Sequence, residues 1–386
     1  MSDQVTGYGG AAVFEGEKLL QGHVLLVRDG VVDGVVAQTD VPKGVRVEAL
    51  KGGTLAPGFV DLQVNGGGGV MLNDDPSVAT LRRMARAHAQ LGATTILPTL
   101  ITDHVETTRA AIDAVERAIA ARVAGIAGLH LEGPHLARAR KGAHDGDLIR
   151  PMDDADLEML TLAARNLPVL KITLAPENVT LDQMRALSGA GAVLSLGHTD
   201  ASHDQCVAAA GAGVRCVTHL FNAMRQMTAR EPGVVGAALA QGGLSAGMIA
   251  DRVHVHGETM RLALAAKQGP GRIFLVSDAM AVAATDRRIF TLNGRQISRR
   301  NGRLTLADGT LAGADLDLAT ALQNLAGIGV PLAQGLAMAT SVPANLIGLG
   351  DKCGHLRPGV AANFVHLDKS LHLTRVWHAG IAMSQG

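Results

Sequence analysis

The chain is poor in aromatic residues, and it carries no excess charge of either sign. Phe, Trp and Tyr make up only 2% of its 386 residues, which argues against a module that recognises its partner by ring stacking. Lys plus Arg and Asp plus Glu both total 35, so the formal net charge is zero at pH 7. A neutral chain has no general electrostatic attraction to nucleic acid or to an anionic membrane surface. We therefore expect neither as a partner.

Cysteine and long apolar runs are also scarce. Cys206, Cys216 and Cys353 are odd in number and too few for a disulfide framework, which suits a reducing cytosol. The start, MSDQVTGYGG, has no basic segment followed by an apolar core, so it does not predict a signal peptide. No apolar run reaches the roughly 18 residues needed to cross a bilayer. With 47% hydrophobic residues, the sequence predicts a soluble, cytoplasmic α/β enzyme with a large core.

Both ends of the chain consist of short apolar runs separated by turns, which is typical of antiparallel β-structure. Before about Leu55 the runs are AAVFEG, HVLLVRDGVVDGVVA and VRVEAL, and the pairs Asp29-Gly30 and Asp33-Gly34 predict hairpin turns. The segment LRPGVAANFVHLDKSLHLTRVWHAG near the C-terminus has the same character. We expect residues 1–55 and 350–386 to form one small β-domain beside a larger domain of residues 56–349.

Between the two ends, strand-like runs alternate with amphipathic helical segments. A helix is predicted in PSVATLRRMARAHAQLG, where apolar or alanine positions recur at three- and four-residue spacing up to Gly92. The predicted strands are 58–64, 94–100, 126–131, 169–174, 192–196, 214–218, 245–250 and 272–277. This alternation predicts an α/β fold of the (β/α)8 TIM-like barrel type, and an open doubly wound sheet is the alternative.

Polar side chains stand at the ends of these strands, although parallel strands buried on both faces should be nearly all apolar. They are Gln63, Asn65, Thr99, His130, Glu132, Thr173, His198, His219, Asp251, His254 and Asp278. The active site of a (β/α)8 barrel is built at the C-terminal ends of its strands. A ring of such residues therefore predicts a catalytic site and favours the barrel over the open sheet.

Three of these residues have the chemistry of a metal site. Glu132 follows the third predicted strand, His198 the fifth and His219 the sixth. One carboxylate and two imidazoles are a common ligand set for catalytic zinc, with a fourth position left for water. Such a metal would lower the pKa of a bound water and polarise a carbonyl. Any one of these histidines alone would be read as a hydrogen-bonded core or surface residue, but three candidate ligands at three strand ends favour a metal.

Asp278, in LVSDAM, ends the eighth predicted strand, across the barrel mouth from Glu132. A carboxylate in this place can take a proton from an attacking water and return it to a leaving amine. The alternative is a helix N-cap, because an Asp that follows a strand often starts the next helix. Position alone favours neither interpretation.

A series of motifs then identifies the family that the chain resembles. They are LAPGFVDLQVNG, LHLEGPHL with KGAHD, SLGHTDAS, THLFNAMRQMTAREPGVVGAAL, IADRVHVH, LVSDAM and GTLAGADL, in order along nearly the whole chain. Together they closely resemble the N-acetylglucosamine-6-phosphate deacetylases of the amidohydrolase superfamily. HLEGP, THLFNAM and REPG are highly specific in combination, whereas the APGF-D start alone would indicate only the superfamily.

The resemblance implies a (β/α)8 barrel with a small β-sandwich domain built from both chain termini. It implies metal-dependent hydrolysis of the acetamide of N-acetyl-D-glucosamine 6-phosphate to D-glucosamine 6-phosphate and acetate, in amino-sugar catabolism and cell-wall recycling. Matched motif by motif, Glu132, His198 and His219 would hold one divalent metal per subunit. Zn²⁺ is the expected ion, and Fe²⁺, Co²⁺ and Mn²⁺ are the alternatives.

The resemblance also assigns roles around the metal. Asp278 would be the proton-shuttling acid and base, and His144 would help to polarise the acetyl carbonyl. The implied substrate-binding residues are Ala143, Asn222, Ala223, Arg230, His254, Leu311, Ala312 and Gly313. Arg230 would bind the phosphate of the neighbouring subunit's substrate, which implies a homodimer; without the family, a surface ion pair with Glu231 would be the favoured interpretation.

Gln63 and Asn65 occupy the place where many members of the superfamily carry a His-x-His metal motif. Their amides bind a transition metal poorly but can hydrogen-bond a water or a metal ligand. We therefore predict one metal, with Gln63 and Asn65 around it rather than on it. Lys171 could be carboxylated to bridge two metals, as in some related barrels; a lysine in the barrel interior that pairs with a carboxylate is the favoured alternative.

Three other functions stay open at this point. The first is a deacetylase of N-acetylgalactosamine 6-phosphate, which differs from the gluco substrate at one hydroxyl. The second is another amidohydrolase such as a cyclic amidase, against which the loss of His-x-His argues. The third is a barrel without catalysis that senses an amino-sugar phosphate, against which the retained Glu132, His198, His219 and Asp278 argue.

Overall fold

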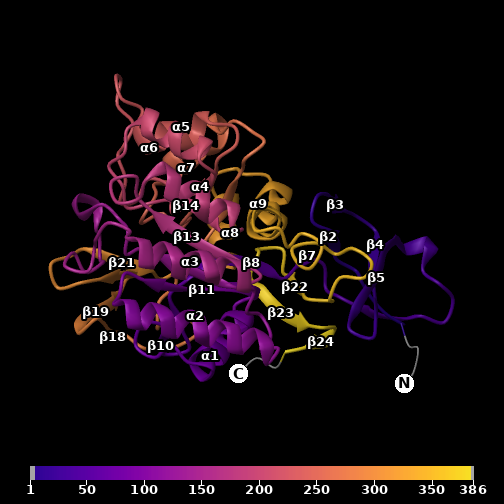
Figure 1. Cartoon of the computed structure of the whole chain (residues 1–386). Coiled ribbons are helices and arrows are strands. Elements are labelled where there is room, and N and C mark those ends of the chain that lie inside the picture. Colours follow the sequence, from indigo (N-terminus) through magenta and orange to yellow (C-terminus); the bar gives the residue numbers. More distant parts are fainter. Residues whose placement is uncertain (1–4, 384–386) are drawn as a thin grey trace. The chain divides into compact units, whose positions relative to one another are not determined.

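The computed structural model describes residues 5–383 (Figure 1), and the outermost residues of the predicted small domain, 1–4 and 384–386, lie outside this range. The chain forms two compact units. One unit contains the residues up to Asp61, His88–Thr95 and the residues from Asp317 onward. The other contains Leu62–Ala87 and Ile96–Leu316. The domain boundaries expected from the sequence, after residues 55 and 349, stay a prediction.

The predicted strands form one eight-stranded sheet. They are β8 (Phe59–Val64), β11 (Ala93–Ile101), β12 (Leu129–Glu132), β13 (Leu170–Leu174), β14 (Val193–Leu196), β15 (Val214–Val217), β16 (Ser245–Met248) and β17 (Ile273–Leu275). Each strand is bonded to the next one along the chain, from β8 to β17. A parallel bridge joins Val64, the last residue of β8, to Ala279, just after β17. The first strand thus meets the segment that follows the last, which confirms the (β/α)8 barrel and rules out the open sheet.

Helices alternate with these strands, as predicted. They are α1 (Val78–Gln90), α2 (Val105–Ala120), α3 (Asp154–Asn166), α4 (Leu181–Gly189), α5 (His203–Gly211), α6 (Gly233–Ala240) and α7 (Gly257–Ala266). Three of them begin at a capping box, in which the side chain of Asp153, Thr180 or Ser202 accepts the backbone N–H three residues later. In Figure 1 the strands lie at the centre of this arrangement, with helices such as α2, α3, α5 and α6 around them.

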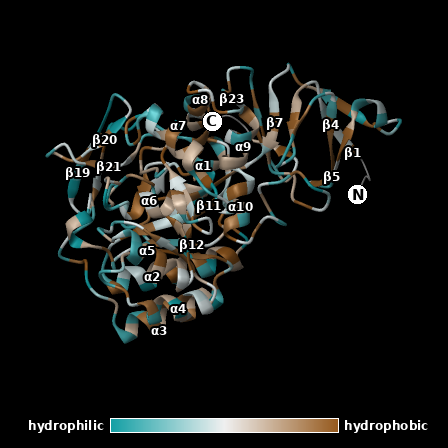
Figure 2. Ribbon diagram, turned by 90° about the horizontal axis from the view of Figure 1, so that it is seen from above, coloured by the Kyte–Doolittle hydropathy of each residue, from teal (hydrophilic) through white to brown (hydrophobic). Residues whose placement is uncertain are grey.

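A four-stranded antiparallel sheet follows β17, and the sequence did not predict it. It contains β18 (Ile289–Leu292), β19 (Arg295–Arg300), β20 (Arg303–Thr305) and β21 (Leu311–Ala314). Its buried face is a cluster that includes Phe290, Leu292, Ile297, Leu304 and Ala312. A short ribbon, β9 (Gly66–Gly67) with β10 (Val70–Met71), follows β8. The exposed β19–β20 hairpin is mostly hydrophilic in Figure 2, unlike the central strands.

The unit that holds both termini contains two β-sheets with a shared core. One has the order β5-β4-β1-β6, and the other the order β24-β23-β22-β7-β2-β3. The strands are β1 (Val5–Gly9), β2 (Ala12–Phe14), β3 (Leu19–Leu20), β4 (His23–Arg28), β5 (Val31–Ala37), β6 (Arg46–Ala49), β7 (Thr54–Pro57), β22 (Phe364–Leu367), β23 (Leu373–His378) and β24 (Ile381–Ala382). Because β22 pairs with β7, both ends of the chain contribute to one sheet, which confirms the small β-sandwich.

An aromatic cluster lies in the core of this unit. Trp377 stacks on Phe364 with ring centroids 4.5 Å apart, and Tyr8 meets both rings edge-on. The unit also contains α8 (Leu318–Ala326), α9 (Leu332–Ala339) and α10 (Ser341–Leu346). Within residues 5–383, no helix has both the length and the apolar character that a membrane span requires.

The two predicted hairpin turns have different outcomes. Asp29 and Gly30 form the two-residue turn between β4 and β5, both with positive φ (49° and 79°), as the Asp-Gly signal predicts. The prediction of a turn at Asp33-Gly34 is wrong, because both residues lie within β5. The pairing of β4 with β5 shifts register close to this point, between Leu26 and Val27, so the glycine marks an irregular stretch of strand rather than a turn.

Candidate active site

A cavity of about 400 Å³ lies at the C-terminal ends of the barrel strands, a size that suits a small ligand. All of the predicted site residues except Gln63 and Arg230 line it: Asn65, Glu132, Ala143, His144, His198, His219, Asn222, Ala223, His254, Asp278, Leu311, Ala312 and Gly313. The structure therefore brings together residues from most of the length of the barrel and from strand β21 of the extra sheet.

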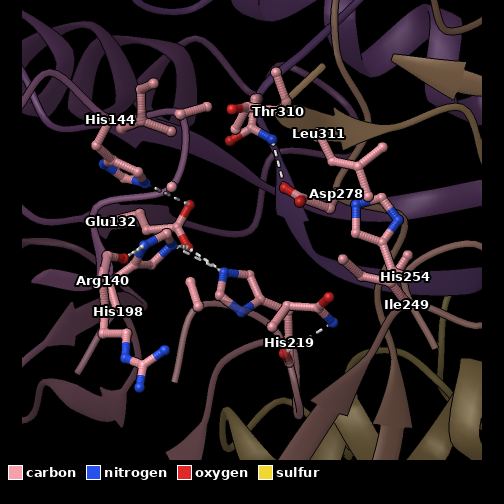
Figure 3. Close-up of a pocket in the computed structure, with 18 of the residues that line it drawn as sticks. Glu132, Arg140, His144, His198, His219, Ile249, His254, Asp278, Thr310 and Leu311 are labelled. Carbon is pink, nitrogen blue, oxygen red and sulfur yellow. Dashed lines mark hydrogen bonds and ion pairs between the residues drawn. The ribbon is translucent and has the colours of Figure 1, made fainter. Parts of the chain in front are cut away.

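The cavity contains the predicted carboxylate and its two imidazoles. Ligand atoms of Glu132, His198 and His219 all lie within 4.8 Å of one another, and all three residues are buried. Oε1 of Glu132 lies 3.0 Å from Nε2 of His219 and 3.4 Å from Nε2 of His198. In Figure 3 the rings of His198 and His219 meet one oxygen of this carboxylate and His144 meets the other.

The local contacts fit a bound cation. Nδ1 of His198 donates to the carbonyl oxygen of Arg140 over 2.8 Å, because a carbonyl can only accept. The neutral ring then has its lone pair on Nε2, which faces Nε2 of His219 at 3.1 Å. Two ring nitrogens and a carboxylate that converge in this way form the donor set that a divalent transition metal prefers. The residues present therefore fit the predicted metal.

The charges of the site are strongly coupled. Burial by itself would raise the pKa of Glu132, but its contacts with His198 and His219 outweigh burial and hold that pKa well below its usual value. Burial would lower the pKa of His219, and the contact with Glu132 reverses this effect and raises it. Glu132 is thus kept as an anion although it is buried, which is the state that a metal ligand needs.

Asp278 lies across the cavity, bound by the two amides of the first strand. Nδ2 of Asn65 donates to its Oδ1 over 2.7 Å, and Nε2 of Gln63 donates to the same oxygen over 3.1 Å. Nε2 of Gln63 also donates to Glu132, at 3.1 Å from Oε1. Burial, and then the negative charge of Glu132, raise the pKa of Asp278.

Asp278 is not the cap of a helix, which was the alternative to a role in the site. The next helix, α8, begins after Asp317, whose side chain accepts from the backbone N–H of Thr320. The backbone of Asp278 has a φ of 51°, and His198 and His219 also have positive φ, at 47° and 31°. Non-glycine residues rarely adopt this conformation, and strained positions cluster at functional sites. The strain here directs three polar side chains into the cavity.

His144 and His254 lie on opposite sides of the cavity (Figure 3). Nε2 of His144 is 3.9 Å from Oε2 of Glu132, and burial lowers the pKa of His144 to about 3, so its ring is neutral. Nδ1 of His254 meets Oδ2 of Asp251 at 2.6 Å, and Oδ1 of Asp251 accepts the backbone N–H groups of Val253 and His254. Asp251 thus fixes the orientation of His254.

Some polar residues of the predicted ring do not reach the cavity. Thr99, His130 and Thr173 lie deeper in the barrel, where His130 contacts Thr99 Oγ1 at 3.1 Å and Thr173 Oγ1 at 2.8 Å. Nζ of the buried Lys171 lies 3.1 Å from Nε2 of His130, so Lys171 belongs to this lower layer, in the barrel interior as predicted. These residues alternate along their strands with apolar neighbours. The sequence therefore does not distinguish the polar residues that line the cavity from those that lie deeper in the barrel.

The arginines near the cavity were only partly indicated by the sequence. Arg230 is exposed and does not line the cavity of its own chain, and its role at a neighbouring subunit's site stays a prediction. The ion pair with Glu231, which was the interpretation favoured without the family, is absent from the described residues. Instead, Glu231 accepts the backbone N–H groups of His203 and Gly233. Arg140, which the sequence analysis missed, lines the cavity and pairs with Asp200 at 2.7 Å. The basic segment LARARKG before His144 is the signal that could have indicated it.

Comparison with known proteins agrees with this fold. The sequence matches the amidohydrolase family over residues 54–382 and the NagA composite domain over residues 9–55. The chain therefore belongs to the amidohydrolase family, a family of metal-dependent enzymes, and it is a hydrolase. This confirms the family predicted from its motifs.

Relatives of this chain include sugar-phosphate deacetylases. An N-acetylgalactosamine-6-phosphate deacetylase of Shewanella sp. (strain ANA-3) is 39% identical over 383 residues, which cover 97% of this chain and 95% of that protein. An N-acetylglucosamine-6-phosphate deacetylase of Haemophilus influenzae is 33% identical over 350 residues, covering 89% and 90%. The crystal structure of N-acetylglucosamine-6-phosphate deacetylase from Pasteurella multocida superposes with a TM-score of 0.93 at 32% identity, covering 98% and 100%.

Proposed function

We propose that this chain hydrolyses the acetamide of N-acetyl-D-glucosamine 6-phosphate to D-glucosamine 6-phosphate and acetate. One observation carries the proposal: Glu132, His198 and His219 form a metal-ligand cluster that faces Asp278 across a cavity of about 400 Å³. A water-activating group and a proton-transfer group that face the same cavity are what amide hydrolysis requires. The named relatives support the choice of an acetylated amino-sugar phosphate.

One divalent metal, Zn²⁺, would be held by Glu132, His198 and His219, with Fe²⁺, Co²⁺ and Mn²⁺ as alternatives that metal analysis distinguishes. When bound, it supplies Lewis-acid activation of the attacking water and of the acetyl carbonyl. Gln63 and Asn65 would lie around the metal rather than on it, because amides bind a transition metal poorly and the N–H groups of both point at carboxylates.

Asp278 moves the proton. As a carboxylate it takes a proton from the attacking water, and as a carboxylic acid it returns that proton to the leaving sugar amine. Its raised pKa brings the two protonation states closer in energy near neutral pH, which suits a group that must accept and then donate. His144 is neutral and buried beside Glu132, so it can donate a hydrogen bond to the oxygen on which negative charge develops.

The substrate would lie between the metal cluster and the rim. His254, Asn222 and Ala223 would bind the sugar phosphate, the backbone at Ala143 would line the same loop, and Leu311, Ala312 and Gly313 of β21 would close over it. Arg230 is exposed and does not line the cavity of its own chain, which supports a homodimer in which it binds the phosphate at the neighbouring site.

Three free, buried cysteines suit the proposed cytoplasmic location.

Mixing two inactive variants tests the role of Arg230. Arg230→Ala lacks the phosphate contact and Asp278→Asn lacks the base, so each protein alone should be inactive. If the arginine acts across a dimer, subunit exchange should restore activity in about a quarter of the sites, because one site of each mixed dimer then has both residues. A mixture that stays inactive although mixed dimers form would contradict the shared site.

A second substrate has a specific observation in its favour. The Shewanella relative, at 39% identity, is named for N-acetylgalactosamine 6-phosphate, which differs at one hydroxyl. Acetate release from the two sugar phosphates, measured side by side as kcat/KM, separates the gluco from the galacto enzyme. A larger kcat/KM for the galacto epimer would show that the enzyme prefers N-acetylgalactosamine 6-phosphate and hydrolyses its acetamide by the same reaction.

The decisive variant for the reaction is Asp278→Asn, which keeps the size of the side chain and removes the base. Acetate release should fall by about 10²–10⁴-fold while the metal content is retained. Asp204→Asn, whose side chain is 99% exposed, is the matched control and should behave like wild type. Wild-type turnover in Asp278→Asn would end the proposed mechanism. A wild-type protein that binds the sugar phosphate but releases no acetate, even with added metal, would instead be a sensor.

A further inference from the structure

Two neighbouring imidazoles in the cavity both face the Glu132 carboxylate but have different surroundings on their far sides. The rings of His144 and His198 are 4.3 Å apart between centroids and meet edge to face. Nε2 of each faces Glu132, at 3.9 Å for His144 and 3.4 Å for His198. Position alone would allow either ring to bind the metal or to donate a hydrogen bond. The partner of Nδ1 decides between the two, because a neutral imidazole has one N–H and one lone pair.

The two Nδ1 atoms face partners of opposite kind. Nδ1 of His198 faces the carbonyl oxygen of Arg140, which only accepts, so His198 has its lone pair on Nε2. Nδ1 of His144 accepts the backbone N–H of Thr102 at 3.4 Å, and an amide N–H only donates. The hydroxyl oxygen of Thr102 lies 2.8 Å from the same nitrogen. A hydroxyl can donate or accept, so beside the amide N–H it can serve as a second, shorter donor. His144 therefore has its proton on Nε2.

We propose that Thr102 is a positioning residue that sets His144 as the Nε2–H tautomer. This inference rests on the proposed function and extends it. In that tautomer, the side of His144 that faces the cavity is an N–H group, which cannot bind a metal and can donate to the acetyl oxygen as its negative charge develops. Thr102 thereby gives the two adjacent histidines different roles: His198 is a metal ligand, and His144 is a hydrogen-bond donor.

Thr102 is well fixed for this role. It directly follows β11, is 1% exposed and does not line the cavity, so it acts on the substrate only through His144. Its hydroxyl also lies 3.4 Å from the carbonyl oxygen of Glu132. A side chain at Gly133 would place its Cβ 2.3 Å from the Thr102 hydroxyl oxygen, so the neighbouring strand end leaves room for this contact only because residue 133 is glycine.

The tautomer can be measured without any turnover. Protein labelled with ¹⁵N at histidine and loaded with Zn²⁺ gives two-bond ¹H–¹⁵N spectra that distinguish Nε2–H from Nδ1–H, and His144→Gln identifies the resonances of His144. The wild-type ring should have the Nε2–H pattern. An Nδ1–H pattern in the wild-type protein would overturn the proposal, whatever the variants do.

Paired variants then test the hydroxyl. Thr102→Val keeps the shape of the side chain and removes the donor, whereas Thr102→Ser keeps the donor. Thr102→Val should shift the population toward Nδ1–H and lower kcat about 10-fold, with KM within about twofold, because one hydrogen bond to His144 is lost. Thr102→Ser should restore both. A Thr102→Val protein with unchanged tautomer and kcat would contradict the proposal.

Failure of the proposed function looks different from failure of this inference. If wild-type protein releases acetate from neither sugar phosphate, the function is wrong while the spectrum still decides the tautomer. If His144→Ala, which has no N–H to donate in place of the ring, retains the wild-type kcat, the donor role of His144 is wrong. If His144→Ala loses activity and Thr102→Val does not, only the role of Thr102 is wrong.

Discussion

Asn65 donates a hydrogen bond of 2.7 Å from its side-chain amide to Oδ1 of Asp278, and both residues are buried. Gln63 donates to the same oxygen and, with the same nitrogen, to Glu132. Two neutral amides thus stabilise two neighbouring carboxylates that would otherwise repel each other. In a barrel with a His-x-His pair, a second cation could do this work. Here N–H groups do part of it, and they bind no metal.

This contact predicts a change in the pH profile. Burial and the charge of Glu132 raise the pKa of Asp278, whereas the hydrogen bond from Asn65 lowers it. Asn65→Ala removes the donor, so the pKa should rise further. The carboxylate is the active base, so activity is lost as pH falls through this pKa. The acidic limb of kcat/KM should therefore move to higher pH.

The control for this shift is Asn166→Ala, because Asn166 is exposed at the end of α3. Its profile of kcat/KM against pH should match that of the wild type. An acidic limb that stays in place in Asn65→Ala would show that Asp278 is not the base whose ionisation limits the rate.

Removing the carboxylate of the cluster should remove the metal. Glu132→Gln keeps the size of the side chain but lacks the anionic oxygen that lies 3.0 Å from Nε2 of His219. Affinity should fall by more than the roughly 10–100-fold that the loss of an indirect contact causes. Metal analysis after dialysis checks this, with Gln63→Ala as the matched variant that should retain its metal. Two metals in the wild-type protein, with one lost in Gln63→Ala, would contradict a single-metal site.

The barrel and its metal cluster could be predicted from the sequence because both depend on regular features. Parallel strands bring their C-terminal ends to one side, so Glu132, His198 and His219 had to converge once their strands were recognised. The long helix before Gly92 was equally clear from its periodicity, and α1 spans Val78–Gln90.

The rest of the site depends on contacts between distant parts of the chain. The tautomer of His198 is set by a carbonyl 58 positions earlier, and Thr102 lies 42 positions before His144. No local pattern contains this information. The sheet β18–β21 was missed because β19 reads RQISRR, where a single buried residue, Ile297, stands among polar ones. Such a strand has too little apolar periodicity to be recognised alone.

The aromatic cluster of the β-sandwich should dominate the stability of that unit. Trp377 is 1% exposed and stacks on Phe364, and the guanidinium of Arg375 lies 4.5 Å above its ring. Trp377→Ala should cost about 3–5 kcal/mol of unfolding free energy, because it leaves a large cavity and removes the stacking partner. Denaturant unfolding checks this, with Leu262→Ala, at a position 65% exposed, expected to change stability by less than about 0.5 kcal/mol. A Trp377→Ala protein as stable as that control would show that the cluster contributes little.

The pair of Asp251 and His254 should control substrate affinity rather than the rate of the chemical step. Burial would raise the pKa of Asp251, but its hydrogen bond to His254 and the charge of that ring lower it, so the carboxylate stays ionised beside the imidazole. With Nδ1 held by this carboxylate, Nε2 of His254 is left to meet the sugar phosphate. Asp251→Asn keeps the shape but removes the charge, and KM should rise about 10-fold with kcat within about threefold, as for the loss of a charge-assisted hydrogen bond.

A double-mutant cycle tests whether the two residues act as one unit. His254→Gln should raise KM by a similar factor, and Asp251→Asn added to it should change KM little further, because the aspartate acts through the histidine. Full additivity of the two effects would show that Asp251 contributes independently of His254. A fall in kcat with unchanged KM would instead assign the pair to the chemical step, beside Asp278.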